Sequence, residues 1–371
     1  MEGAEASGIQ GGGRRKLDSP PWPPDSLAPF LFRGGCTGRG IGPRYFEGGR
    51  GFFLPGFGIM SKIAVGGQAV IEGVMMRAPN ALAIAVRRPN GEVVVKEDVW
   101  RSLSNRFKFL KWPLIRGSVV LIETLINGLQ ALSFSANQAL EEGKGEDQLS
   151  SWAIGSVMAL AFGIGILFFV VLPHYLTGFL GDFFGRELGV ESVLFHLIDG
   201  LIKVLFLVGY IYLISLMKDI RRIFQYHGAE HKCIFAYEAG EELTVANARK
   251  YSTLHPRCGT AFLLIVVIVS IFLFSAIFPF LPKFPSLGKG LTNLIYVGIK
   301  LPLLFPIAGL AYEVIKLSGK KADHPLLKWI IAPGLWLQRL TTRPPADDQI
   351  EIALRALQGA LRIETGQKTI L

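Results

Sequence analysis

Residues 226–260, YHGAEHKCIFAYEAGEELTVANARKYSTLHPRCGT, concentrate the reactive side chains of this 371-residue chain. Three of the six histidines and two of the three cysteines lie within this segment. On either side the chain is strongly apolar. We therefore predict a compact His/Cys-rich polar loop, residues 218–260, between two membrane spans.

Apolar stretches of about 20 residues surround this loop and are long enough to cross a bilayer as helices. They predict transmembrane helices 1 and 2 within residues 151–217 and helices 3 and 4 within residues 261–317. We expect an integral membrane protein that is mainly α-helical and polytopic, with about four transmembrane helices and the lipid bilayer as its partner. The net charge of +10 then reflects basic loops on one side of the membrane and does not indicate nucleic-acid binding.

The charges of the loops predict one orientation in the membrane. The loop after span one is acidic, whereas the segment after span two is rich in lysine and arginine. Because basic loops stay on the cytoplasmic side, the polar segment, the N-terminal domain and the C-terminus are expected on that side. In a chloroplast envelope or thylakoid membrane this side would be the stroma.

Residues 60–150 predict a small polar α+β domain. Ala81–Arg88 and Glu92–Asp98 have the composition of strands, and Asn90-Gly91 between them favours a tight β-hairpin. Just before them, the glycine-rich run 66–77 suggests close backbone approach. Glu72 and Arg77 in this run are candidates for an ion pair.

A helix is predicted from Pro113 to about Leu140, with an apolar stripe that suits packing on the membrane surface. A fifth span over residues 114–136 is the alternative, although Glu123 would be costly in the bilayer unless it is paired. Residues 318–371 predict an interfacial segment with tryptophans and a C-terminal amphipathic helix, which we expect to dock on the N-terminal domain.

The first 59 residues are rich in glycine and proline and predict a disordered leader. A transit peptide for the chloroplast is the functional interpretation. The alternative is a tail without a targeting role, with Met60 as an older initiator.

The spacing of His227, Glu230 and His231 gives an H-x-x-E-H pattern, which is the inverted form of a zinc-protease motif. On a helix the two imidazoles share one face and can bind one Zn²⁺, with Glu230 as the catalytic base. A third metal ligand is required. The candidates on the same predicted side of the membrane are Glu313, His255 and Cys258.

Other functions fit the same residues. The histidines can simply hydrogen-bond within a folded loop, in which case the protein is a non-enzymatic assembly or scaffold factor that binds other membrane proteins. A cysteine nucleophile with a histidine base is a further alternative. A transporter is the third functional class, because His196, Asp199 and Lys203 share one face of span two. For Asp199 and Lys203 we predict an ion pair.

Four stretches of this chain resemble the bacterial YqhQ-like family of polytopic membrane proteins, some of which are labelled metal-dependent enzymes. They are residues 66–77 (GGQAVIEGVMMR), 113–136, 226–233 and 255–260. The resemblance extends over roughly residues 62–340 and implies a multi-spanning membrane protein. It leaves the leader outside, as expected for a plant, chloroplast-targeted version of a bacterial protein.

Overall fold

The computed structural model describes residues 63–139, 151–186, 188–283, 287–320 and 325–366. The predicted leader and the linker 140–150 lie outside the described residues. Within them the chain forms one antiparallel sheet with the strand order β1-β2-β3-β4. Its strands are β1 (Gly66–Val70), β2 (Gly73–Arg77), β3 (Ala81–Arg87) and β4 (Val93–Val99).

The helical elements are α1 (Leu103–Arg106), η2 (Lys108–Lys111), α2 (Ile115–Ala139), α3 (Ser151–Ile166), η3 (Leu167–Val171), α4 (Leu172–Phe183), α5 (Val193–Ser215), α6 (Lys218–Ala239), α7 (Val245–Arg249), α8 (Gly259–Ile277), η4 (Phe278–Phe280), α9 (Lys289–Lys320), α10 (Pro325–Thr341) and α11 (Asp347–Glu364). The element η3 is a short π-helical stretch that continues α3 into α4.

The predicted hairpin is confirmed as β3 and β4, with Ala81 opposite Val99 and Arg87 opposite Val93. Gly91 in the turn has a φ of 88°, a value that glycine adopts at little cost. The glycine-rich run adds two strands that the sequence did not resolve. They are β1 and β2, which pair from Gly66↔Arg77 to Val70↔Gly73.

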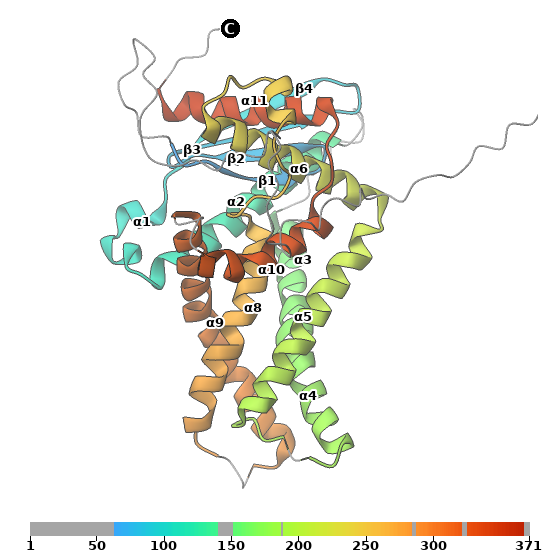
Figure 1. The fold of residues 1–371 in the computed structure, drawn as a ribbon, viewed down its shortest axis with the longest axis vertical. Coiled ribbons are helices and arrows are strands. Elements are labelled where there is room, and N and C mark those ends of the chain that lie inside the picture. The colour runs from blue at the N-terminus through green and yellow to red at the C-terminus, as the bar shows by residue number, and fades with distance from the viewer. Residues whose placement is uncertain (1–62, 140–150, 187, 284–286, 321–324, 367–371) are drawn as a thin grey trace, which may run out of the picture. The chain divides into compact units, whose positions relative to one another are not determined.

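The sheet is buried on both faces. Alternate residues of the central strands, such as Met76 and Ala83, form one core with α6 and α11, whereas Met75 and Ile84 form another with α2. Figure 1 shows α11 and α6 over one face of the sheet and α2 below the other. This two-sided burial explains why β2 and β3 are continuously apolar, a pattern that is usual when both faces of a strand are covered.

The prediction of a polar loop over residues 218–260 is wrong, because most of this segment is helical. The helix α6 has an apolar stripe that includes Tyr226, Ala229 and Cys233 and that packs on the sheet and α11. The charged residues of α6 lie on its other faces. Because they lower the average hydrophobicity of the segment, the composition alone does not reveal the apolar stripe. The helix ends where Gly240 adopts a left-handed φ of 78°, a common way to terminate a helix.

Below this polar domain, α3, α4, α5, α8 and α9 form the helical bundle that Figure 1 shows. Among the described residues, five helices are long and apolar enough to cross a membrane. Four of these segments are Gly155–Phe183, Val193–Ser215, Gly259–Phe280 and Lys289–Leu317, and they correspond to the four predicted spans. The fifth is α2.

The topology decides whether α2 crosses the membrane. The sheet and α6 share one hydrophobic core, so both lie on the same side, and the chain must cross an even number of times between them. Three candidate spans lie in that interval, which means that one of them does not cross. We assign this role to α2 because it packs against strands of the sheet and because its buried Glu123 accepts hydrogen bonds from Arg77 (3.1 Å) and Ser102 (2.8 Å).

The predicted ion pair between Glu72 and Arg77 is wrong. Arg77 binds Glu123 of α2, and Glu72 binds Arg222 of α6 with two hydrogen bonds, one of them 2.6 Å long. Each charge therefore joins the sheet to a helix on a different face. Residues this far apart in the chain give no pairing signal in the sequence.

Candidate metal centre

The site begins with two histidines on one face of α6. His227 and His231 are one helical turn apart, and their ring centroids are 4.5 Å apart. His231 is 1% exposed, whereas His227 is half-buried. The helix that carries them is held between the sheet and α11, so packing fixes the direction of both rings.

Cys258 is brought to these rings from the start of α8. It is the residue before the first turn, and its Sγ accepts a hydrogen bond from the Thr260 backbone N–H (3.4 Å). The loop before it is attached to α6, because Lys232 Nζ donates to the carbonyl oxygens of Arg249 (2.9 Å) and Tyr251. The result is a group of three candidate ligand atoms, from His227, His231 and Cys258, that lie within 4.8 Å of one another.

Backbone carbonyls orient both imidazoles. Nδ1 of His227 lies 2.8 Å from the Thr341 carbonyl oxygen, and Nδ1 of His231 lies 2.5 Å from that of Thr253. A carbonyl only accepts, so each Nδ1 carries a proton and donates it. When a ring is neutral, as metal binding requires, its Nε2 atom therefore presents a lone pair, and Nε2 of His227 lies 3.2 Å from Cys258 Sγ. Ligands of bound metals in proteins are commonly oriented by outer hydrogen bonds of this kind.

Cys258 and His227 favour each other's charged forms, whereas burial lowers the pKa of His231 and keeps that ring neutral. Burial opposes a thiolate, but the His227 and His231 rings outweigh this and hold the pKa of Cys258 well below its ordinary value. Burial also opposes an imidazolium at His227, but the contact with Cys258 raises the pKa of this ring to about 9. A thiolate with two imidazoles is a set of ligands that zinc prefers.

Glu230 lies beside this group on α6 and is buried. Its carboxylate accepts a hydrogen bond from the Gly67 backbone, but its buried Oε2 has no hydrogen-bond partner. Burial raises the pKa of Glu230 to about 8. A buried carboxylate oxygen without a partner is rare and requires an explanation, such as an ion or a catalytic role.

The structure separates the three candidates for the third ligand. Cys258 joins the two histidines, whereas His255 packs beside His231 with a centroid distance of 5.5 Å. The Nδ1 atom of His255 accepts from the Arg257 backbone N–H (3.2 Å), and its Nε2 lies 3.5 Å from Glu238. Glu313 is not part of the group; it binds Arg116 of α2 with two hydrogen bonds.

Two histidines and one cysteine leave a fourth coordination position that the protein does not fill from this group. Three protein ligands with one open position are typical of catalytic zinc, whereas structural zinc usually has four protein ligands. A cysteine nucleophile with a histidine base remains an alternative, because the Thr341 carbonyl orients His227. The second imidazole aimed at the same sulfur favours a metal, since a nucleophile requires one base.

The groups that orient the site were not found from the sequence. They are the carbonyls of Thr341 and Thr253 and the side chain of Gln338, which accepts from the His255 N–H and donates to its carbonyl, both at 2.8 Å. Backbone carbonyls have no residue-type signal. Gln338 of α10 is the only side chain among these groups, so it is the only one of them that the sequence could have suggested.

A family model described as a protein of unknown function, DUF1385, matches residues 112–363. The chain belongs to this DUF1385 family. It is 33% identical over 314 residues to the uncharacterized protein YqhQ of Bacillus subtilis strain 168, over 81% of this chain and 93% of the relative. The expected resemblance to YqhQ is thereby confirmed. No solved structure matches the chain.

Proposed function

We propose that this DUF1385 protein is a metal-dependent hydrolase of the membrane surface, with His227, His231 and Cys258 as ligands of one Zn²⁺. The observation that carries the proposal is the shared orientation of the two imidazoles. Both Nδ1 atoms are bound to backbone carbonyls, so both Nε2 atoms are available on the side of Cys258. If the two histidines only formed hydrogen bonds within the fold, nothing would require the Cys258 sulfur to lie beside both rings.

The position of the site indicates the class of substrate. Cys258 immediately precedes α8, whose apolar helix is one of the crossing segments, so the site lies where the polar domain meets the bilayer. The substrate we propose is therefore a membrane constituent, either a lipid or a segment of a membrane protein. Zinc bound there would supply Lewis acidity that polarises a carbonyl or phosphoryl oxygen.

Glu230 is the proposed general base. In its carboxylate form, which predominates above its pKa of about 8, it would accept a proton at Oε2 from the attacking water, whose oxygen bonds to the electrophilic atom of the substrate. The same carboxyl group would then return the proton to the leaving group as the scissile bond breaks. Glu230 is held for this role by α6 and by the backbone of Gly67.

A scaffold function is the second candidate, and one observation favours it. The group joins three elements that are distant in the chain, because α6 supplies the histidines, α8 begins at Cys258 and α10 ends at Thr341. A structural metal there would fix the polar domain to the bundle and present it to other membrane proteins. For both functions we propose a chloroplast membrane as the location.

Metal analysis tests the site. The full chain and its variants would be purified in parallel in detergent without chelator. We expect about one zinc per chain in the wild type and large losses in His231→Ala and Cys258→Ser, because two remaining ligands bind weakly. His255→Gln is the matched control and should keep its metal. Wild-type protein without metal, or equal metal in His231→Ala, would reject the site.

Glu230→Gln separates the enzyme from the scaffold. This variant keeps the shape of the side chain and should keep the metal in both cases. A hydrolase predicts that cells carrying only this variant show the same changes in membrane lipids and membrane proteins as cells lacking the protein. A scaffold predicts membranes like those of the wild type, and this result would overturn the catalytic role.

A further inference from the structure

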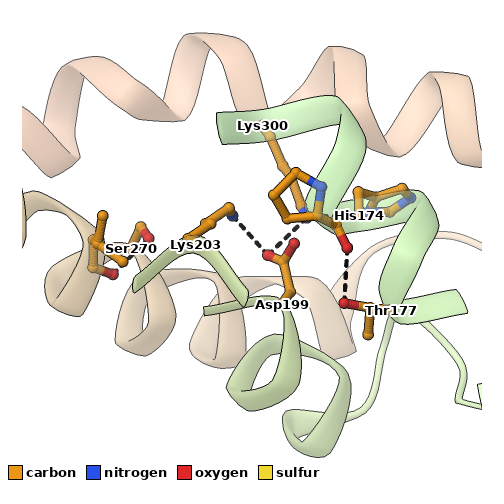
Figure 2. A network of polar contacts seen from close by, with 8 residues as sticks. His174, Thr177, Asp199, Lys203, Ser270 and Lys300 are labelled. Atoms are coloured by element: carbon orange, nitrogen blue, oxygen red, sulfur yellow. Dashed lines mark hydrogen bonds and ion pairs between the residues drawn. The ribbon is translucent and has the colours of Figure 1, made fainter. Parts of the chain in front are cut away.

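A second polar cluster lies inside the helical bundle, away from the metal centre. Asp199 of α5 accepts from Lys203 Nζ (2.6 Å) and from Lys300 Nζ (3.2 Å), and Lys300 lies 3.1 Å from Nδ1 of His174 (Figure 2). The predicted pair of Asp199 and Lys203 is thus confirmed. The additions that the sequence did not reveal are Lys300 from α9 and His174 from α4.

The cluster lies deep in the bundle. Lys300 is 0% exposed and Asp199 is 1% exposed. Because an α-helix rises 1.5 Å per residue, Lys300 lies ~16 Å along α9 from Lys289 at its start. That distance is about half of the ~30 Å thickness of the hydrocarbon core. The rings of Phe195, Phe274 and Phe278 surround the Lys300 ammonium, with their centroids 5.4–6.0 Å from Nζ. The Lys300 ammonium is therefore enclosed by aromatic rings.

The charges in the cluster do not balance. Two ammonium groups share the single carboxylate of Asp199, and among the described residues no other acid binds either lysine. The other titratable groups packed around them are His174, His196 and Tyr296, whose ring packs on Phe278, and the adjoining helix α8 contributes the uncharged Ser270 and Phe274. One surplus positive charge in an apolar bundle is costly, so one proton in the cluster is held less firmly than the rest.

The geometry shows which proton that is. Lys203 is one helical turn from Asp199 and has the shorter bond to it, so these two form the neutral pair. Lys300 carries the surplus charge and contacts an imidazole. The Asn293 side chain is within hydrogen-bonding reach of the His174 ring, and the Val190 backbone is within reach of the His196 ring. His174 Nε2, on the far side of its ring from Lys300, is buried.

The helices are irregular at the same depth. A π-helical stretch and Pro173 directly precede His174, and Pro302 follows Lys300 in α9. Each proline lacks an N–H and leaves a carbonyl of the preceding turn without its helical partner. Interruptions of this kind are tolerated in membrane helices where they line a functional site.

We propose that Asp199, Lys203, Lys300 and His174 form a proton-transfer site through which this protein moves protons across the membrane. In the transfer, a proton leaves Lys300 Nζ and bonds to Nδ1 of His174, so the lysine becomes a neutral amine. The ring then releases a proton from Nε2 to a water molecule on one side of the membrane, and Lys300 takes up a proton from a water molecule that reaches it from the other side. The ion pair between Asp199 and Lys203 stays intact throughout. This inference does not depend on the candidate metal centre. It specifies the proton as the ion for the transporter alternative that the sequence suggested.

A flux measurement tests the site. The purified full chain would be reconstituted into liposomes of neutral phospholipid that contain a pH-sensitive dye, and an inside-negative potential would be set with potassium and valinomycin. We expect the lumen to acidify faster than in protein-free liposomes. Lys300→Arg keeps the positive charge but cannot release its proton, so flux should fall at least about tenfold. Lys300→Met and His174→Gln should also lose flux.

Lys289→Met is the matched control, because this lysine lies on the same helix and is 83% exposed. It should conduct like the wild type. Size-exclusion profiles and melting curves identify folded variants, and Lys300→Met should fold because the neutral pair remains. If Lys300→Met does not fold, the proton flux of Lys300→Arg alone decides the outcome. Wild-type flux equal to that of empty liposomes, or a folded Lys300→Arg protein that conducts like the wild type, would overturn the proposal.

Discussion

At the scale of single residues, Gly67 connects the sheet with the candidate site. A Cβ at this position would lie 2.7 Å from the Met75 carbonyl oxygen and 3.0 Å from Glu230 Cδ, distances shorter than normal contacts. A Cβ on the neighbouring Gly66 would meet nothing within 4 Å. The glycine-rich motif therefore contains one position where the backbone closely approaches the carboxyl group of Glu230, in line with the close backbone approach that the sequence suggested, and one where it does not.

Gly67→Ala should destabilise the protein by about 1–3 kcal/mol, because the added methyl group forces the strand or Glu230 to move. Gly66→Ala is the matched control and should melt close to the wild type. Thermal unfolding of both variants in detergent measures the difference. Equal melting temperatures for the two would show that the close approach at Gly67 is not required.

At the scale of elements, α10 holds the segment that leads to Cys258. Gln338 is fully buried and forms two hydrogen bonds of 2.8 Å with the backbone N–H and carbonyl of His255. The same helix ends at Thr341, whose carbonyl orients His227. This helix therefore supports both sides of the candidate site.

Gln338→Leu leaves two buried backbone groups without partners, each at a cost of about 1–3 kcal/mol. Because the loop loses its support, we also expect the metal affinity to fall about 10–100-fold. Melting curves and competition with a coloured chelator measure the two effects. Gln130→Leu, at an exposed position of α2, is the control. A Gln338→Leu protein that equals this control in both measurements would contradict the supporting role.

At the scale of the whole molecule, the packing of the sheet on α6 fixes the topology. We therefore expect four helices to cross the membrane, with the sheet, the candidate metal centre and α11 on one side of it. Single cysteines at Trp152, Phe184 and Arg355 would test this arrangement, because all three side chains are exposed. Cys36 would be replaced by serine, and the remaining native cysteines are buried.

A membrane-impermeant maleimide added to sealed vesicles should label cysteines at 152 and 355 from the same side and the cysteine at 184 from the other. Trp152 follows α2, so labelling it from the side opposite to Arg355 would show that α2 crosses the membrane. That result would contradict the assignment of α2 as the helix that does not cross.

The sequence by itself determined the features that depend on local composition and period. Uninterrupted apolar length gave the four spans, Asn90-Gly91 and alternating strands gave the hairpin, and the spacing of four residues placed His227 and His231 on one face. The pair of Asp199 and Lys203 belongs to the same class, since both lie on one helix. In each case the relevant contacts lie within a few residues along the chain.

Only the tertiary structure decided the features that join distant segments. It chose Cys258 over His255 and Glu313 as the partner of the two histidines, and it added Lys300 to the buried cluster. It also turned the expected polar loop into α6, because the face of this helix that carries Tyr226 and Cys233 is buried by the sheet and α11. The physical reason is common to all three. Burial and charge pairing depend on which surfaces meet in space, and local spacing along a chain does not contain that information.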